Sequence, residues 1–250
     1  MRVELLDTPI DVLGFDETLE RCEAAMASRE QCVHVAMNAA KFVKMRSDRE
    51  LHNDVTGADI IGIDGMGIVL ALRILGLRDA PKVSGVDLML ALLAHCSASG
   101  RRPYILGARQ DVLERAIATA QKRWPGLAMA GSRNGYFGPE DEADIVADIR
   151  ASGADCLFIA MPTPRKERFL ARYAREVEVP FIMGVGGSVD VLAGHVSRAP
   201  GWMQRNGLEW LHRLIQEPRK MFWRYASTNG RFLALVLGAR LRGEKVSLPG

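Results

Sequence analysis

The sequence predicts an α/β protein with a mostly parallel sheet that is covered by helices on both faces. Short apolar runs alternate with longer amphipathic segments along most of the chain, which is typical of strands joined by helical crossovers. The runs are apolar throughout, as expected for strands buried on both faces. With 250 residues, 48% apolar and 25% charged, the chain is long enough for a sizeable core. This composition excludes disordered, collagen-like and coiled-coil proteins.

Six short apolar runs are predicted to be strands, and most are followed by a segment with helical character. The predicted strands cover 32–37, 58–63, 103–106, 127–130, 156–160 and 180–183. The predicted helices cover 39–54, 65–75, 84–99, 111–124, 140–151 and 165–176. The helix at 84–99 has the clearest pattern, because its Leu and Met side chains recur with a period of about 3.6 residues.

Residues 196–250 differ from the rest of the chain and are predicted to form a basic, helical appendage to an α/β domain at 1–195. The appendage holds ten Lys or Arg and three Asp or Glu, a net charge of +7 against −4 for residues 1–195. Trp202, Trp210 and Trp223 lie among these cations, a combination that suits the headgroup zone of an anionic membrane. The apolar run 232–239 is too short to span a membrane but can lie in its interface.

Two other interpretations of the appendage stay open. Its helices pack on the core with their arginines facing water, or it binds RNA, although the chain has no RNP motif. No sheet strand is predicted beyond residue 230, so we expect the α/β core to fold without residues 230–250.

Several classes of protein are excluded by what the sequence lacks. Cys22, Cys32, Cys96 and Cys156 form no CxxC motif and the histidines show no metal-ligand spacing, so we expect reduced thiols, no metal and no cofactor. His34 lies inside a predicted strand and is expected in the core. The N-terminus lacks a signal-peptide core and no run approaches the ~20 apolar residues of a membrane span, so we expect a cytoplasmic location. A net charge of +3 is too small to indicate nucleic-acid binding.

In a sheet of this kind, ligands bind beyond the carboxyl ends of the strands. The residues that follow the predicted strands are rich in Gly, Asn, Asp and Pro. They are Asn38, Asp64–Gly67, Gly107, Asn134–Tyr136, Met161–Glu167 and Gly184–Asp190. The same residue types also form ordinary turns, which is the alternative at each position.

Asp64 is the sharpest candidate among these residues. It follows the apolar run Ile60–Ile63 and precedes two glycines, so its carboxylate lies at a strand end. Apolar neighbours there raise a carboxyl pKa and make the group a better general base. The alternative is that Asp64 caps the helix that starts at Gly65.

The segment Gly184–Ser188 is a second candidate, because successive backbone N–H groups in a glycine-rich turn can hold a diphosphate. Neither GxGxxG nor GxxxxGK(S/T) occurs in the chain. Arg165 and Lys166 follow two prolines, and they either neutralise phosphate charge or lie on a solvated helix face. The absence of GxSxG disfavours a hydrolase.

Eight blocks occur in a fixed order along the chain. They are Asn38, Asp64–Gly67, Val83–Asp87, Gly135–Phe137, Pro164–Glu167, Gly184–Asp190, Arg198–Pro200, and Leu208–Trp210 with Arg213 and Glu217–Arg219. In this order they resemble the WecG/TagA/CpsF glycosyltransferases, which form glycosyltransferase family 26. The resemblance covers about residues 5–225.

The resemblance implies a Rossmann-like α/β fold and a metal-independent, inverting transfer of a hexose from a UDP-sugar. UDP-glucose and UDP-ManNAc or UDP-ManNAcA are the donors that it suggests. The implied acceptor is a sugar on a polyprenyl diphosphate, and the product feeds cell-surface polymers such as exopolysaccharide. The implied location is the cytoplasmic face of the inner membrane, on its anionic surface, with a homo-oligomer as a further option and no nucleic-acid partner.

Carried over position by position, the resemblance implies roles for individual residues. Asp64 corresponds to the proposed catalytic base. The donor and its UDP are assigned to Gly65, Gly67, Gly107, Tyr136, Lys166, Gly186, Gly187, Arg213 and Arg219, with Arg224 as a further candidate cation. The acceptor is assigned to Asn38, Lys82 and Asp87. The chain departs from the family pattern at Ala36, Lys82 and Lys166, where Thr, Arg and Gln are usual.

Two rival functions stay open at this point. An NAD-dependent oxidoreductase is disfavoured because GxGxxG with a downstream acidic residue is missing. A non-catalytic, nucleotide-binding membrane adaptor predicts binding of UDP without turnover.

Overall fold

The structure is a computed structural model that describes residues 1–248, without the side chains of Lys220 and Arg224. Within these residues an eight-stranded sheet has the order β1-β2-β4-β3-β8-β7-β5-β6. β1 runs antiparallel to β2, and every other neighbouring pair is parallel. The strands are β1 (Arg2–Glu4), β2 (Pro9–Asp11), β3 (Cys32–Met37), β4 (Ile60–Ile63), β5 (Pro103–Gly107), β6 (Gly131–Arg133), β7 (Cys156–Ala160) and β8 (Phe181–Gly184).

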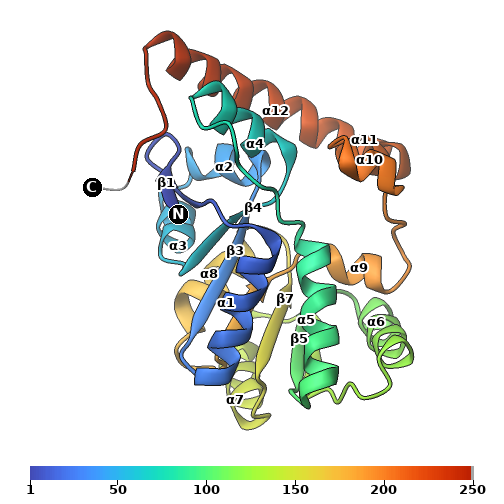
Figure 1. Ribbon diagram of the computed structural model, residues 1–250. Coiled ribbons are helices and arrows are strands. Elements are labelled where there is room, and N and C mark those ends of the chain that lie inside the picture. Colours follow the sequence, from blue (N-terminus) through green and yellow to red (C-terminus); the bar gives the residue numbers. More distant parts are fainter. Residues whose placement is uncertain (249–250) are drawn as a thin grey trace.

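Helices cover both faces of the sheet, as predicted (Figure 1). One face packs against α1 (Phe15–Ser28), α5 (Gly85–Ser99), α6 (Gln110–Arg123) and α9 (Ser188–Leu192). The other face packs against α2 (Ala39–Met45), α3 (Arg49–Thr56), α4 (Met66–Ile74), α7 (Glu142–Ala151), α8 (Arg165–Tyr173) and α12 (Pro218–Leu241). Strand β7 shows why its run is apolar throughout, because Phe158 packs on the first face and its neighbours Leu157 and Ile159 on the second.

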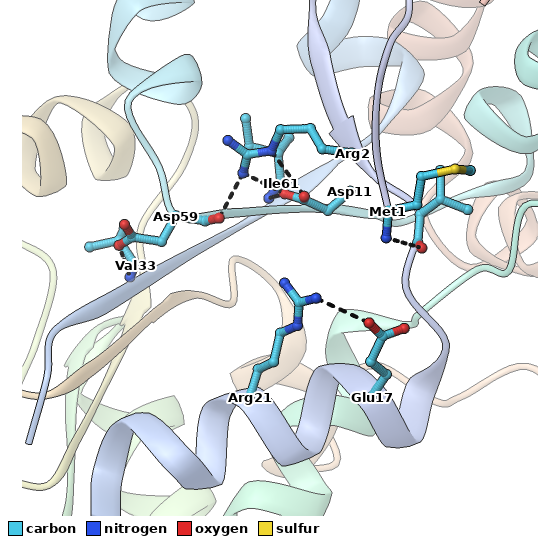
Figure 2. Close-up of polar contacts among 9 residues, drawn as sticks. Met1, Arg2, Asp11, Glu17, Arg21, Val33, Asp59 and Ile61 are labelled. Carbon is cyan, nitrogen blue, oxygen red and sulfur yellow. Dashed lines mark hydrogen bonds and ion pairs between the residues drawn. The ribbon is translucent and has the colours of Figure 1, made fainter. Parts of the chain in front are cut away.

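The N-terminal hairpin of β1 and β2 was not predicted. It joins the sheet through the buried carboxylate of Asp11, which accepts hydrogen bonds from Arg2 Nε and Nη2 at 2.9 and 2.6 Å and from the backbone N–H of Ile61 at 2.7 Å. Arg2 also donates to the carbonyl oxygen of Asp59 at 2.7 Å, so one guanidinium links three segments (Figure 2). This pairing depends on residues about fifty positions apart, and three-residue strands leave no periodic pattern.

Three further differences concern local elements. The helix predicted at 39–54 is two helices, α2 and α3, because the Asp48 side chain accepts from the Leu51 N–H at 2.9 Å and starts a new helix. The strand predicted at 127–130 lies at Gly131–Arg133 instead. Helix α1 was missed altogether.

Residues beyond 196 are helical, as predicted, and form α10 (Gly201–Arg205), α11 (Glu209–Gln216) and α12. Helix α12 crosses one end of the molecule and contacts α2 and α4 (Figure 1). Its Phe232, Val236 and Ala239 are buried in the same apolar cluster as Phe42 of α2. The structure therefore does not support the expectation that the core folds without residues 230–250, while the domain boundary at 195/196 stays a prediction.

The opposite side of α12 is apolar and exposed. Leu233, Leu237 and Leu241 recur one turn apart and are 51%, 45% and 89% exposed. Trp223, 74% exposed, lies five helical turns before Leu241 and therefore on the same side. Among the described residues, none of the helices combines the length and hydropathy that a membrane span requires.

Candidate functional site

The predicted site residues after β3 and β4 lie next to each other at the carboxyl edge of the sheet. The Asp64 N–H donates to the carbonyl oxygen of Met37 at 2.8 Å, which places Asp64 beside Asn38. Gly65 has a φ of +115°, a value that favours glycine, and a Cβ there would lie 3.8 Å from that of Asn38. The strand-end prediction is confirmed for the position of these two residues.

Asp64 does not cap the helix that follows β4, so that alternative is wrong. The N-cap of α4 is Gly65, and no side chain caps this helix. Instead, the Asp64 carboxylate faces the start of α5, where a Cβ at Gly85 would lie 3.8 Å from its Oδ2. Burial raises the pKa of Asp64 above its ordinary value of 3.8, although the side chain keeps some exposure. A partly accessible carboxylate with a raised pKa fits a general base.

Three charged groups act on Asp64 besides burial. The Lys82 ammonium forms an ion pair with Glu209, which is the first residue of α11. The positive charges of Lys82 and Lys41 lower the pKa of Asp64, and the negative charge of Glu209 raises it. Sequence reasoning missed Glu209 as a site residue, because it contacts Lys82 across 127 positions of the chain.

Asn38 and Lys41 belong to the first turn of α2. The Asn38 side-chain oxygen accepts from the Lys41 N–H at 3.0 Å and caps the helix, so a ligand contact falls to its amide nitrogen. Lys41 turns inward, donates to the carbonyl oxygen of Ala36 at 2.7 Å and pairs with Glu167 at 2.9 Å. Ala36 thus contributes a backbone oxygen that holds the Lys41 ammonium.

Lys166 is buried, so its placement on a solvated helix face is wrong. Its ammonium donates to the Thr163 hydroxyl at 2.6 Å and pairs with Glu167 at 3.0 Å. Burial raises the pKa of Glu167, but the charges and hydrogen bonds of Lys41 and Lys166 outweigh it and lower the pKa to about 2. Two buried cations and one carboxylate therefore join β3, α2 and α8 beneath the edge. No sequence pattern predicts that Lys41 pairs with Glu167.

Arg165 has a structural role in the loop that follows β6. It donates to the carbonyl oxygens of Gly135 and Phe137 at 2.9 and 2.6 Å, and its guanidinium stacks on the Phe137 ring at 4.2 Å. Tyr136, between these two residues, is 75% exposed. The loop is thus fixed with the Tyr136 ring facing solvent.

The glycine-rich turn after β8 lies against a cation from the appendage. A Cβ at Gly187 would lie 2.8 Å from Nη2 of Arg213, so the guanidinium rests on the turn. Gly186 has a φ of +50°, and Arg213 is also 3.7 Å from the Glu217 carboxylate. The structure brings Gly187 and Arg213 together, and the binding of the donor by Gly186, Gly187 and Arg213 stays a prediction. Arg219 is exposed at the start of α12, no contact places it at this turn, and the side chain of Arg224 lies outside the described residues.

Residues 198–213 form one wall of the site. Arg198 pairs with Asp87 of α5 and donates to Gln204 at 2.9 Å. A Cβ at Gly207 would overlap the Met66 side chain, which directly follows Gly65. The predicted acceptor residue Asp87 is therefore held by an ion pair with the appendage.

At two of the glycines assigned to the donor, close packing leaves no room for a larger residue. A Cβ at Gly67 would lie 3.0 Å from that of Ala39, where α4 crosses α2. A Cβ at Gly107 would lie 2.5 Å from the carbonyl carbon of Ala160 in β7. Close contact with a side chain at Gly67 and with backbone at Gly107 explains both glycines, and their contact with a donor stays a prediction.

The cysteines, the histidines and the acidic residues elsewhere in the described chain are the remaining candidates for a metal or nucleophilic site. No cluster of three or more His, Cys, Asp or Glu within it is arranged to hold a metal ion. All four cysteines are free, and burial raises the pKa of Cys32 and of Cys96 to about 12. His34 lies in the core, as expected.

One comparison with known proteins bears on this site. The family model described as "Glycosyl transferase WecG/TagA/CpsF family" matches residues 3–246. The match includes the carboxyl edge of the sheet, the wall formed by the appendage and all of α12.

Proposed function

Because the chain belongs to the WecG/TagA/CpsF family of glycosyl transferases, we propose that it moves a hexose from a UDP-sugar to a sugar linked to a polyprenyl diphosphate. It is a glycosyltransferase that acts on nucleotide sugars in cell-surface polymer synthesis. The proposal adds the UDP donor, the lipid-linked acceptor and the chemistry. The observation that carries it is Asp64, a strand-end carboxylate with a raised pKa that does not cap the following helix α4.

The proposed reaction is a single in-line displacement with inversion. Asp64 takes the proton of the acceptor hydroxyl while its oxygen attacks the anomeric carbon of the donor. The bond from that carbon to the diphosphate oxygen breaks, and UDP leaves with the electron pair. The acceptor binds near Asn38, Lys82 and Asp87, on the same side of the edge as Asp64.

The leaving UDP carries negative charge that must be stabilised. The backbone of Gly186 and Gly187 with the guanidinium of Arg213 supports a diphosphate position there, and Lys166 adds buried positive charge beside β8, where a Cβ at Gly184 would lie 3.2 Å from its side chain. Gly65, Gly67, Gly107, Tyr136 and Arg219 complete the donor assignment. We propose that these cations replace a metal, so turnover persists in EDTA; turnover lost in EDTA and restored by Mg²⁺ or Mn²⁺ would contradict this.

We also propose that the enzyme works on the anionic cytoplasmic surface of the inner membrane, where lipid-linked acceptors are found. The exposed apolar side of α12 supports this, since its other side is already packed on the core. The net charge of +7 over residues 196–250 adds attraction, because each cation near an anionic surface contributes about 1 kcal/mol.

The test is incubation with UDP-glucose, UDP-ManNAc and UDP-ManNAcA in turn, each with a prenyl-diphosphate-linked sugar, followed by mass analysis of the lipid. The proposal expects one donor to add one hexose residue and to release one UDP per product. UDP binding without any product would favour the adaptor, and a nicotinamide absorbance change without sugar transfer would favour an oxidoreductase.

A further inference from the structure

A groove of about 470 Å³ lies between the end of α2 and the second half of α12. Its volume is in the range of small-molecule sites. Three arginines (Arg46, Arg231 and Arg242) and three apolar side chains (Val43, Ala234 and Leu235) form most of its lining. None of the residues assigned to donor or acceptor lines it, so it is separate from the proposed transfer site.

Two of the three arginines are held in place by other groups. The Arg46 guanidinium stacks on the Phe42 ring at 5.1 Å from its centroid and donates to the carbonyl oxygen of Leu6. Phe42 is itself fixed by an edge-to-face contact with Phe232 at 5.4 Å. Arg242 Nε donates to the Glu244 carboxylate at 2.6 Å. A guanidinium with a fixed orientation loses little freedom when it binds an anion.

The charges around the groove leave a surplus of one positive charge. Arg46 has Asp7 at 3.8 Å and Arg242 has Glu244 as partners, so two acidic groups stand against the three arginines. One negative charge would balance the groove. A phosphodiester carries one negative charge and presents oxygens that guanidinium groups bind well.

The lining between the arginines is apolar, which a free anion does not need. Val43, Ala234 and Leu235 offer a surface for a hydrocarbon chain. Ala234 is exposed and lies one residue after Leu233, so the groove opens beside the exposed apolar side of α12. A second copy of the chain is disfavoured, because two such grooves would bring three arginines from each copy together.

We propose that this groove binds one anionic phospholipid, with its phosphodiester on the arginines and the start of an acyl chain on Val43, Ala234 and Leu235. The proposal rests on the membrane location proposed above and goes beyond it. A surface attracted only by bulk charge responds equally to the loss of any cation. A lipid site depends on the arginines that line it.

The experiment uses the full chain in solution and dihexanoyl phosphatidylglycerol below its micelle concentration, measured by ligand-observed NMR. Arg231→Gln removes a groove cation, and Arg240→Gln removes an exposed cation of the same helix that does not line the groove. We expect Arg231→Gln to weaken binding at least fivefold, Arg242→Gln to act in the same direction, and Arg240→Gln to change it less than twofold. Both lipid headgroup and chain protons should report contact.

Three results would overturn the proposal. These are equal loss in Arg231→Gln and Arg240→Gln, binding of glycerol phosphate or inorganic phosphate as tight as that of the lipid, or no binding at all by the folded wild type. Vesicle sedimentation distinguishes the proposed lipid site in the groove from the proposed attachment of the protein to the membrane. Recruitment to phosphatidylglycerol vesicles without binding of the soluble lipid would leave α12 as the anchor and remove the site, whereas binding of the soluble lipid without recruitment would keep the site and remove the anchor.

Discussion

At the carboxyl edge of the sheet, charged side chains lie buried or partly buried and are paired with each other, whereas on the outer side of α12 apolar side chains lie exposed. At this edge Lys41 and Lys166 each form an ion pair with Glu167. Leu237 and Leu241 on α12 face away from the molecule. A region that performs chemistry needs groups fixed within the protein, while an apolar surface needs a partner outside it. Under the proposed function, this difference separates the place where the reaction is catalysed from the surface that holds the enzyme on the membrane.

The largest effect on activity is expected for Asp64, at the carboxyl edge of the sheet. Asp64→Asn keeps the size of the side chain but removes the proposed general base, so we expect turnover to fall about 10²–10⁴-fold. The Kd for UDP should change little, because the diphosphate is assigned to Gly186, Gly187 and Arg213. Transfer rate and calorimetric UDP binding check the two parts, and a variant with near-normal turnover would remove Asp64 from the chemistry.

The two sides of α12 can be separated by neighbouring residues. Phe232 is 6% exposed and packs on Phe42, so Phe232→Ala should cost about 3–5 kcal/mol of unfolding free energy. Leu233 faces outward, so Leu233→Ala should change stability by less than about 0.5 kcal/mol while weakening vesicle binding. Denaturant unfolding and sedimentation with anionic vesicles measure both. Equal stability losses would mean that α12 does not have two distinct sides.

His34 is a buried titratable group in the core, outside the candidate site, and it makes the stability of the fold depend on pH. His34 is 2% exposed, and burial first, then the Lys41 charge, lowers its pKa from 6.5 to about 4, with Asp11 opposing. As the pH falls, His34 therefore takes up a proton in the unfolded chain at a higher pH than in the folded chain. The free energy of unfolding is highest above pH 6.5 and decreases as the pH falls toward 4. Across this window the loss is at most about 3 kcal/mol.

His34→Leu should remove that loss. The variant is then expected to lose less stability than the wild type between pH 7 and pH 4.5, measured by denaturant unfolding at each pH. Parallel curves for the two proteins would show that His34 takes up no proton on unfolding. Glu167 does not confuse this comparison, because its depressed pKa acts mainly below its ordinary value of 4.5 and is common to both proteins.

The smallest expected effect concerns the charges around Asp64. Glu209 raises and Lys82 lowers its pKa, so Glu209→Gln should move the acid limb of the kcat/KM profile to lower pH, and Lys82→Met should move it to higher pH. The limb reports the base in the free enzyme. Shifts of the same sign in both variants would contradict the arrangement, whatever their effect on the rate itself.

The strand-end rule explains how much of the edge could be predicted. It depends only on short apolar runs followed by turn residues, which located Asp64, Asn38 and the Gly186–Gly187 turn. Pairings between distant residues leave no such pattern. Lys41 with Glu167 and Lys82 with Glu209 bridge more than a hundred positions each, and the β1–β2 hairpin likewise depends on Asp11 reaching Ile61.

Composition predicted a basic, aromatic and helical C-terminal region. It did not distinguish the apolar residues that pack on the core from those that face outward. In α12, Phe232 and Val236 face the core while Leu233 and Leu237 face outward. A helix that is apolar on two sides has little amphipathic contrast. The run 232–239 therefore fits a buried helix and an interfacial one equally well, and only the packed structure assigns each leucine to a side.

The separation of chemistry from location is tested most directly by one transfer assay with two acceptors, a short-chain soluble prenyl-diphosphate sugar and a long-chain one in anionic vesicles. Leu237→Ser combined with Leu241→Ser should keep the rate on the soluble acceptor within twofold of wild type and lose at least tenfold on the vesicles. Asp64→Asn should lose activity equally on both. If the leucine variant slows both acceptors alike, or neither, α12 is not the element that brings this enzyme to its lipid substrate.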